Sequence, residues 1–331
     1  MTQGIVPGLN ERRLLRRAFA IKLDLAAPEP LADRELGSQV RAVLRLMPAA
    51  LLAALLIPVQ MAAVALNLRM AERIPRFFHR NVLRLLGIRV RRRGRMSRHR
   101  PTLFVANHSS YLDISVLGSL IPGSFVAKSE IADWPFFGLL AKLQRTVFVD
   151  RQRRTTAEQR NQLGERIARG HNLILFPEGT SSDGNRILPF RSALLGAAEP
   201  PRGMPAEATP ALEVQPVSVS YTKLDGCPLG YHLRSLVAWY GDMELAPHLF
   251  ALAGLGRIEV VVEFHPPTTL AAVGDRKALT EYCYRQVADG HSAAIGGRLH
   301  SPSERAGRAA LAAPQQPAQP PERANSVAKA D

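Results

Sequence analysis

The chain has 331 residues, of which 46% are hydrophobic, and 43 Lys and Arg against 28 Asp and Glu give a formal net charge of +15. This length supports one large domain or two small ones with a sizeable core, and the charge predicts an anionic partner: nucleic acid, an anionic bilayer or acidic ligands. The two cysteines, Cys227 and Cys283, form neither a metal-ligand pattern nor a disulfide framework, and they fit a reducing compartment.

The N-terminal region contains the longest apolar run of the chain. Residues 1–38 lack a signal-peptide layout and are predicted to form a peripheral arm. Residues 46–68 carry no charge over 23 positions, which is enough to cross a bilayer core that takes about 20 residues. Arginines are more numerous after this run than before it, which predicts that the rest of the chain lies in the cytoplasm. The alternatives are a buried core helix and an interfacial helix pair broken at Pro58.

A basic amphipathic segment covers residues 69–95, where large apolar residues are interleaved with Arg76, Arg80 and Arg84. This composition suits an anionic membrane surface. Nucleic acid is the alternative, but the chain shows no recognised nucleic-acid fold signature and has the charge-free run directly upstream. We therefore predict membrane-embedded and basic amphipathic helices over residues 39–95, membrane lipids as partners, and no nucleic-acid partner.

Short β-rich runs alternate with helical patterns over residues 96–300, the region predicted to form the main domain. This alternation predicts an α/β fold with a mixed, largely parallel sheet flanked by helices, and some antiparallel pairing among the later strands. Residues 199–213 read as a surface loop and the proline-rich residues 301–331 as a disordered tail. Strands are expected at 102–106, 124–128, 146–150, 172–177, 214–221, 236–240 and 258–264, and helices near 112–120, 130–143 and 155–169.

The motif NHSSYLD, at residues 107–113, connects the first of these strands to a helix. Ser109 and Ser110 are both competent N-caps, and one turn of helix brings Asp113 back toward His108. A carboxylate on one imidazole nitrogen fixes the tautomer and raises the basicity of the other, which can then accept a proton from a hydroxyl. The pair of His108 and Asp113 lacks a Ser or Cys nucleophile as third member, so it need not form a covalent acyl-enzyme, and the nucleophile would belong to the substrate. The alternative is a turn in which Asp113 only caps the helix.

Three further segments carry unusual side chains at the C-terminal ends of predicted strands, where open α/β sheets bind ligands. They are Arg151 after TVFVD, the FPEGTSS turn at residues 176–182, and the strand around Pro216. Gly179 permits a tight turn whose N–H groups can face an anion or an oxyanion. The four residues PEGT, at 177–180, are also typical of an ordinary turn at the end of a strand.

Taken together and in this order, NHSSYLD, VFVDR, FPEGTSS and the Pro216 strand resemble the glycerolipid acyltransferase family, whose bacterial prototype is 1-acylglycerol-3-phosphate acyltransferase. The resemblance covers roughly residues 70–270. It implies that His108 deprotonates the free hydroxyl of a lysolipid while Asp113 orients the imidazole. The alkoxide then attacks the thioester of acyl-carrier protein or acyl-CoA directly. No metal and no cofactor other than this acyl donor is implied.

The resemblance also implies a set of substrate-binding residues. Arg151 would bind the anionic head group of the acceptor, and Lys128, at the end of a strand, would reach the same anion. The alternative for Lys128 is a solvated residue at a strand end. Glu178, Gly179 and Thr180 would shape the acceptor pocket, and Pro216 would lie near the acyl or donor side.

The motif departs from the phosphate-binding pattern at residue 181. Family members that act on lysophosphatidic acid often carry an arginine after the threonine, where this chain has Ser181. Either Arg186 or Arg191 replaces it, or the acceptor lacks a phosphate monoester. The segments FPEGTSSDGNRILPF and VAWYGDMEL resemble the branch that includes lyso-ornithine lipid O-acyltransferases, whose zwitterionic head group needs fewer cations. Both acceptors remain open at this point.

Two other functions are compatible with the sequence. One is a non-catalytic membrane lipid-binding module with the same fold, against which the intact His108 and Asp113 argue. The other is a thioester hydrolase that uses the same base on water. The function we predict is a lysolipid O-acyltransferase at an inner membrane of bacterial type, with its catalytic domain on the cytoplasmic side.

Overall fold

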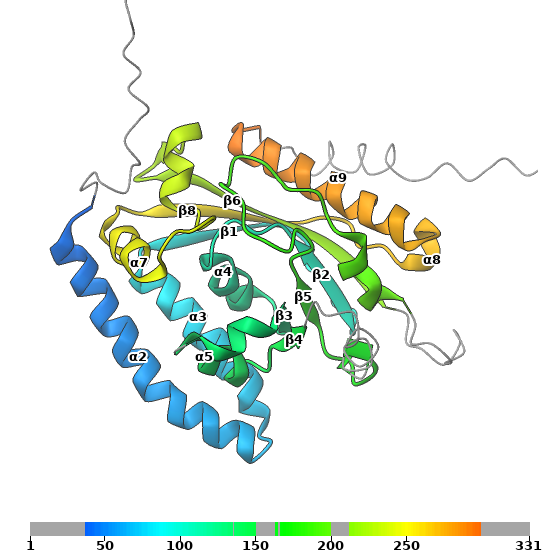
Figure 1. Cartoon of the computed structure of the whole chain (residues 1–331), viewed down its shortest axis with the longest axis horizontal. Helices are drawn as coiled ribbons and strands as arrows, with labels where there is room; N and C mark the ends of the chain where they lie inside the picture. The colour runs from blue at the N-terminus through cyan, green and yellow to red at the C-terminus, as the bar shows by residue number, and fades with distance from the viewer. Residues whose placement is uncertain (1–36, 135, 150–162, 165, 200–211, 299–331) are drawn as a thin grey trace, which may run out of the picture.

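A computed structural model describes residues 37–134, 136–149, 163–164, 166–199 and 212–298. Within these ranges the chain forms one eight-stranded sheet with helices on both faces (Figure 1). The strands are β1 Ile88–Gly94, β2 Thr102–Ala106, β3 Ser124–Lys128, β4 Val147–Val149, β5 Leu173–Leu175, β6 Glu213–Leu224, β7 Cys227–Pro228 and β8 Ile258–Phe264. The α-helices are α2 Gln39–Ala65, α3 Arg73–Leu85, α4 Leu112–Leu120, α5 Phe137–Leu143, α7 Leu245–Gly254, α8 Leu270–Val273 and α9 Arg276–Ile295. Short 3-10 helices are η2 Arg69–Glu72, η3 Ser129–Asp133, η4 Ser192–Ala198 and η6 Tyr231–Leu236.

The sheet is largely parallel, as the sequence predicts. Its strand order is β1-β8-β6-β2-β5-β3-β4, with β7 paired to β6. Strands β6, β2, β5, β3 and β4 run parallel to one another, whereas β8 runs antiparallel to β6 and β1 runs parallel to β8. The C-terminal ends of β2 to β6 therefore meet at one edge of the sheet, which is where ligands bind in open α/β sheets.

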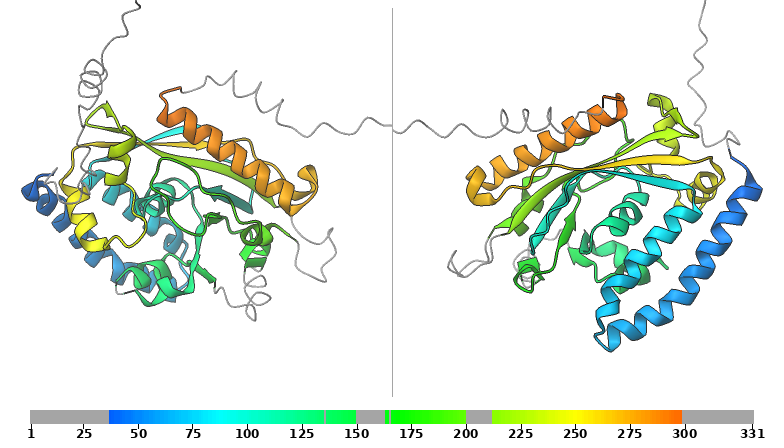
Figure 2. Two further views of the ribbon diagram at one scale, coloured as in Figure 1. Left: turned by 45° about the horizontal axis from the view of Figure 1, so that its top comes forward. Right: turned by 180° about the vertical axis from the view of Figure 1, so that it is seen from behind.

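The central strand β2 shows why the sheet is covered on both faces. All five of its residues are buried. Phe104 and Ala106 belong to a core with α3, α4 and α7, whereas Leu103 and Val105 belong to a second core under α9. A strand buried on both faces must be apolar throughout, because its side chains alternate between the two cores. Figure 2 shows α9 on one face of the sheet and α2, α3 and α4 on the other.

The basic segment 69–95 does not continue as helix to its end. Helix α3 ends at Leu85, Gly87 takes a positive φ of 73°, and β1 then pairs in parallel with β8. Along β1, Ile88 and Val90 face the core while Arg89 and Arg91 are exposed. The helical interpretation was wrong for residues 88–94 because a short strand at the edge of a sheet can alternate arginines with apolar residues.

The strand expected at residues 236–240 is also absent. The short helix η6 ends at Leu236, and residues 238–240 have no regular structure. The N–H of Trp239 donates to the C=O of Ser109 at 2.8 Å, so this segment crosses the end of the sheet rather than joining it. Val237 and Ala238 are buried, which explains why the segment is apolar. Periodicity alone does not distinguish a buried irregular segment from a strand.

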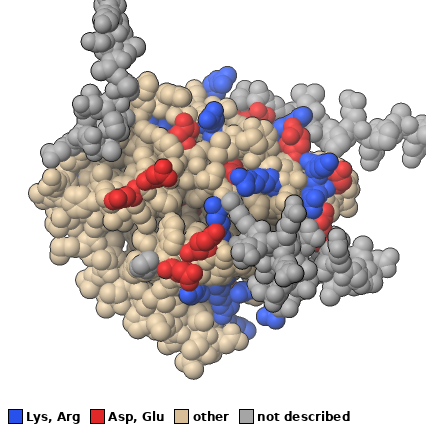
Figure 3. All heavy atoms as spheres, viewed as in Figure 1, with Lys and Arg blue, Asp and Glu red and all other residues tan. Residues whose placement is uncertain are grey.

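Helix α2 is one continuous helix of 27 residues that contains both Pro48 and Pro58, so the alternative of a helix pair broken at Pro58 is wrong. By length and composition it is the one helix among the described residues that is able to cross a membrane. It packs against α7, α3 and α5, while its outer face is apolar and exposed. In Figure 3 the lower left border of the molecule, where α2 lies in the same view of Figure 1, is drawn without blue or red side chains. The exposed residues are Val40, Val43, Leu44, Met47, Leu51, Leu55, Val59 and Met61.

Several predictions fall outside the described residues. They concern Arg151, the tail at 301–331, and most of the N-terminal arm, of the loop at 199–213 and of the helix expected near 155–169. Both cysteines are described, and neither forms a disulfide: Cys227 is exposed in β7 and Cys283 is buried in α9.

Candidate active site

His108 and Asp113 form a direct hydrogen bond at the C-terminal edge of the sheet. His108 Nδ1 lies 2.9 Å from Asp113 Oδ2, and the imidazole is 20% exposed while the carboxylate is fully buried. The same Oδ2 accepts the backbone N–H groups of Ser109 at 2.7 Å and Ser110 at 2.9 Å. Because these partners donate to one carboxylate oxygen, Nδ1 carries the hydrogen and the opposite nitrogen, Nε2, is left as an acceptor.

Asp113 holds the turn that the two serines were predicted to cap. Helix α4 begins at Leu112 after Tyr111, which has no side-chain capping bond. The two serines precede the N-cap position, which Tyr111 occupies, although the Ser110 hydroxyl still accepts the N–H of Leu112 at 3.4 Å. The carboxylate of Asp113, in the first helical turn, binds the N–H groups of residues 109 and 110. One carboxylate therefore both closes the turn and orients the imidazole.

Tyr221 is a third member of this cluster that the sequence analysis missed. It lies on β6, and its hydroxyl donates to Asp113 Oδ1 at 2.8 Å from a buried position. Burial, with the nearby Asp113 charge, raises the pKa of Tyr221 well above its usual value, so the hydroxyl stays protonated and remains a donor. The only sequence signal was its place at the end of the expected strand 214–221.

Segments far apart in the sequence hold the turn at residues 108–110 in position. The C=O of His108 accepts the N–H of Ser182 at 3.0 Å, and the C=O of Ser109 accepts the N–H of Trp239 at 2.8 Å. On the other side, the N–H of His108 donates to Glu178 Oε1 at 2.7 Å. A turn fixed from three directions presents His108 in one orientation, which is the pre-organisation that proton transfer requires.

Glu178 does not line an open pocket, because its side chain is only 2% exposed. Its two carboxylate oxygens accept the N–H groups of His108, at 2.7 Å, and of Leu188, at 2.8 Å. Burial raises the pKa of Glu178 to about 8, although both backbone bonds act in the opposite direction. The geometry thus gives this carboxylate a bracing position between the His108 turn and the loop after β5.

We expect Glu178→Gln to reduce the pH dependence of stability. The pKa of about 8 in the folded chain exceeds the usual 4.5, so the folded state keeps a proton that the unfolded chain loses in this interval. The wild-type free energy of unfolding should therefore fall as pH rises through about 8, by on the order of 2 kcal/mol between about pH 6 and about pH 9. Denaturant titrations in detergent at both pH values test this.

The neutral glutamine has no such titration, so the variant should show a flatter profile whatever its baseline stability. Glu130→Gln, which removes an exposed carboxylate, is the control and should keep the wild-type slope. Parallel profiles for the wild type and Glu178→Gln would contradict the assignment.

Aromatic side chains gather around the turn that carries His108. The His108 ring stacks on Phe176 with centroids 4.3 Å apart and planes inclined by 21°. Nearby, the hydroxyl of Tyr111 contacts His248 Nδ1 at 3.0 Å, and the Tyr111 ring meets Trp239 edge to face at 6.1 Å. The imidazole therefore combines a carboxylate partner on Nδ1 with an aromatic ring stacked on its face.

The remaining predicted residues are distributed unevenly around this pair. Gly179 has a φ of 71° and its N–H donates to the C=O of Phe176 at 3.2 Å, so this N–H is engaged within the turn. Thr180 is exposed next to it. Lys128 ends β3 at the same edge of the sheet, two strands from β2, and is half-buried and engaged in an interaction.

Three other predicted residues do not join the cluster. Arg186 and Arg191 are exposed and, within the described residues, make no side-chain ion pair. Pro216 is buried within the sheet in register with Val105, three residues before His108, and its C=O accepts the N–H of His265. This position packs in the centre of β6 and offers no open surface. Among the described residues, no group of three or more His, Cys, Asp or Glu is placed to hold a metal ion.

Comparisons with known proteins identify the family of the chain. A family described as Acyltransferase matches residues 87–220. The chain is 44% identical to a lyso-ornithine lipid O-acyltransferase of Brucella abortus over 73% of this chain and 91% of that protein, and 41% identical to one of Rhizobium meliloti over 79% and 89%. It is 31% identical to a 1-acyl-sn-glycerol-3-phosphate acyltransferase of Neisseria gonorrhoeae over 57% and 69%.

The fold is also similar to a solved structure. A crystal structure of the 1-acyl-sn-glycerophosphate acyltransferase from Thermotoga maritima aligns with a TM-score of 0.55 and 20% sequence identity. The alignment covers 79% of this chain and 99% of the other. At this identity the likeness supports the fold, and the site rests on the geometry above.

Proposed function

Because the chain belongs to the acyltransferase family, as its motifs predict, we propose that it is a lyso-ornithine lipid O-acyltransferase. It would move a fatty acyl group from acyl-carrier protein or acyl-CoA to the free hydroxyl of the lysolipid. The observation that carries the chemistry is the hydrogen bond between His108 Nδ1 and Asp113 Oδ2, which leaves Nε2 available beside the exposed part of the ring.

In the proposed mechanism His108 is the general base and Asp113 orients it. Nε2 removes the proton from the acceptor hydroxyl, and the resulting alkoxide attacks the carbonyl carbon of the donor thioester. The C–S bond then breaks, and the imidazolium returns its proton to the departing thiolate. The buried carboxylate stabilises the imidazolium between these steps, so no side chain of the protein needs to be acylated.

The acceptor assignment rests on the relatives and on one side chain. The two relatives that are 41% and 44% identical carry the lyso-ornithine lipid name, whereas the relative named for a phosphate acceptor is 31% identical. Ser181 stands where phosphate-binding members often have an arginine, and Arg186 and Arg191 are directed to solvent. A site with fewer Lys or Arg side chains to bind the head group suits a zwitterionic head group better than a phosphate monoester. Arg151, Lys128 and Thr180 remain proposed contacts for the acceptor.

An acyl-transfer assay with one labelled donor separates the candidate functions. Purified protein in detergent receives lyso-ornithine lipid, lysophosphatidic acid or no acceptor. We expect acylated ornithine lipid as the main product. Phosphatidic acid as the main product would reassign the acceptor, and free fatty acid released without any lysolipid would identify a hydrolase. Transfer to no lysolipid at all would favour a non-catalytic lipid-binding module.

We also propose that α2 anchors the chain to the membrane by embedding its outer face rather than by crossing the bilayer alone. The helix is packed against α7, α3 and α5 along its inner side, which includes the buried Ala42, Ala53 and Ala63. A helix packed on the domain in this way would have to separate from it before it could span the bilayer. Exposed Trp134 and Phe136 extend the apolar surface, and Trp134 contacts Trp239 beside the site. This arrangement would place the active site against the cytoplasmic leaflet of an inner membrane.

Acidic substitutions on this face should release the protein from membranes. Leu51 and Leu55 are 61% exposed each, so Leu51→Asp with Leu55→Asp should leave the packing intact while removing apolar contact and adding charge. We expect membrane partitioning to fall roughly tenfold or more, measured by flotation with vesicles. Tyr231→Asp, at an exposed position on η6, is the control and should float like the wild type. Undiminished flotation of the double variant would show that another segment anchors the chain.

A further inference from the structure

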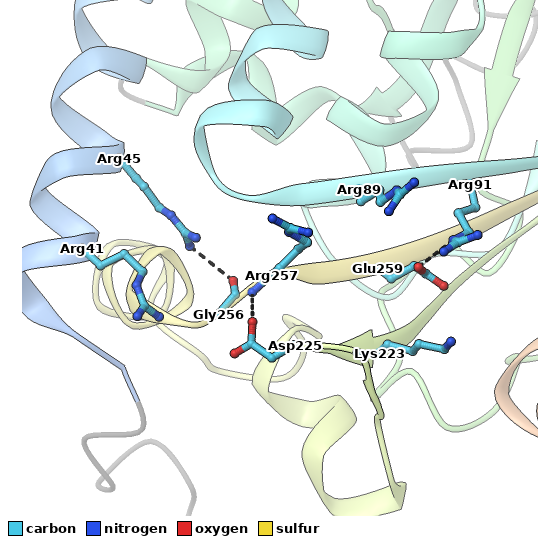
Figure 4. Close-up of a pocket in the computed structure, with 10 residues that line it drawn as sticks. Arg41, Arg45, Arg89, Arg91, Lys223, Asp225, Gly256, Arg257 and Glu259 are labelled. Carbon is cyan, nitrogen blue, oxygen red and sulfur yellow. Dashed lines mark hydrogen bonds and ion pairs between the residues drawn. The ribbon is translucent and has the colours of Figure 1, made fainter.

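A basic cleft lies where the start of α2 meets the edge of the sheet. It has a volume of about 490 Å³ and is formed by α2, β1, the β6–β7 turn and the start of β8 (Figure 4). Six cations and two carboxylates line it, and none of these residues belongs to the site around His108. The charged residues are Arg41, Arg45, Arg89, Arg91, Lys223, Arg257, Asp225 and Glu259.

The floor of the cleft is built from groups that already have hydrogen-bond partners within the protein. Arg45 Nη1 donates to the C=O groups of Ala253 at 3.1 Å and Leu255 at 2.8 Å, which end α7. Asp225 accepts the N–H of Arg257 at 2.6 Å, which ties the β6–β7 turn to the start of β8. At Gly256 a Cβ would overlap the Asp225 carboxylate, which would then have to shift. These contacts fix the shape of the cleft.

The rim, in contrast, consists of cations with little local compensation. Arg91 pairs with Glu259 at 2.6 Å, and Arg41 makes one long bond of 3.3 Å to the C=O of Gly254. Within the described residues the side chains of Arg89, Lys223 and Arg257 have no carboxylate partner. Like charges held around a fixed cleft repel one another, and a bound anion relieves that repulsion.

We propose that this cleft binds the phosphate group of an anionic membrane lipid. Guanidinium groups match phosphate oxygens in charge and in their paired donor geometry. The same turns of α2 that supply Arg41 and Arg45 carry the exposed apolar side chains of Val40, Leu44 and Met47. One short segment therefore offers cations to a head group and apolar surface to acyl chains. The cleft holds a head group, and the chains remain in the bilayer.

Flotation with defined vesicles tests the proposal on the full chain. The test variant is Arg89→Gln with Arg257→Gln, two exposed side chains at the rim. The matched control is Arg98→Gln with Arg298→Gln, two exposed arginines outside the cleft. Vesicles contain phosphatidylcholine alone or with phosphatidylglycerol, and inorganic phosphate is added as a competitor. Thermal unfolding and turnover with detergent-solubilised substrates are measured for both variants.

We expect the test variant to bind phosphatidylglycerol vesicles roughly tenfold more weakly, with unchanged binding to neutral vesicles and unchanged turnover and unfolding temperature. An equal loss of vesicle binding in the control variant would show that general surface charge explains the effect, and it would overturn the proposed lipid site. Displacement by inorganic phosphate at the same concentration as the lipid phosphate would assign the cleft to free phosphate instead. Unchanged vesicle binding with weaker transfer from acyl-carrier protein would make the cleft a carrier docking surface and overturn the lipid assignment.

Discussion

Replacing His108 by alanine is expected to abolish acyl transfer while leaving folding and membrane association unchanged. The substitution removes the atom that accepts the hydroxyl proton, and general-base catalysis of this kind typically contributes about a hundredfold to ten thousandfold. The imidazole is partly exposed and stacks on Phe176, so its loss leaves no large cavity. The turn itself stays braced by Glu178 and Asp113, which bind backbone N–H groups rather than the His108 ring.

Three measurements on the same preparation separate this result from unfolding. They are initial transfer rates in detergent, thermal unfolding and vesicle flotation. His232→Ala, which removes an exposed histidine on η6, is the matched control and should retain wild-type rates. A His108→Ala variant with near wild-type turnover would show that another group is the base, and the histidine would then be no more than part of a turn.

Asp113→Asn is expected to lower kcat by at least about a hundredfold. Asparagine can retain one oxygen for the N–H groups of Ser109 and Ser110, so the turn should survive. The variant lacks the negative charge that stabilises the imidazolium of His108 during proton transfer. The weaker base should also shift the acid limb of the pH profile of kcat/KM toward lower pH. This shift distinguishes a carboxylate that acts through His108 from one that merely caps α4.

Two further variants complete this test. Tyr221→Phe removes one hydrogen bond to Asp113 Oδ1 but keeps the carboxylate charge, so its effect on kcat should be smaller, about tenfold. Asp133→Asn, at an exposed position in η3, is the control and should leave both kcat and the pH profile unchanged. Wild-type turnover of Asp113→Asn would support the helix-capping alternative that the sequence leaves open.

Local sequence determined the central pair and most of the sheet. His108 and Asp113 lie on one turn between β2 and α4, and the five buried residues of β2 form a continuous apolar run. Such features depend on neighbours within a few residues, so strand, turn and helix signals identify them. The parallel arrangement followed from the alternation of strands and helices, and the family followed from the order of the four motifs.

Only the tertiary structure decided which distant groups complete the site. Tyr221 is 108 residues from Asp113, and Trp239 and Ser182 reach the turn from separate loops. Nothing local indicates such partners, because hydrogen bonds across a sheet depend on strand order and register. The same cause explains Glu178, which the family resemblance assigned to a pocket but whose carboxylate oxygens bind backbone N–H groups of His108 and Leu188.

The N-terminal region shows the same division between composition and packing. Its apolar run and its arginines were evident from the sequence, and they predicted a membrane-embedded segment long enough to cross a bilayer. Whether a long apolar helix stands alone or packs on a domain depends on its partners, and α2 packs against α7, α3 and α5. The arginines of β1 likewise became one wall of a cleft only when β8 and β6 placed Arg257 and Lys223 beside them. The sequence shows which residues are apolar or basic. Whether basic residues lie side by side depends on contacts between residues that are far apart in the sequence.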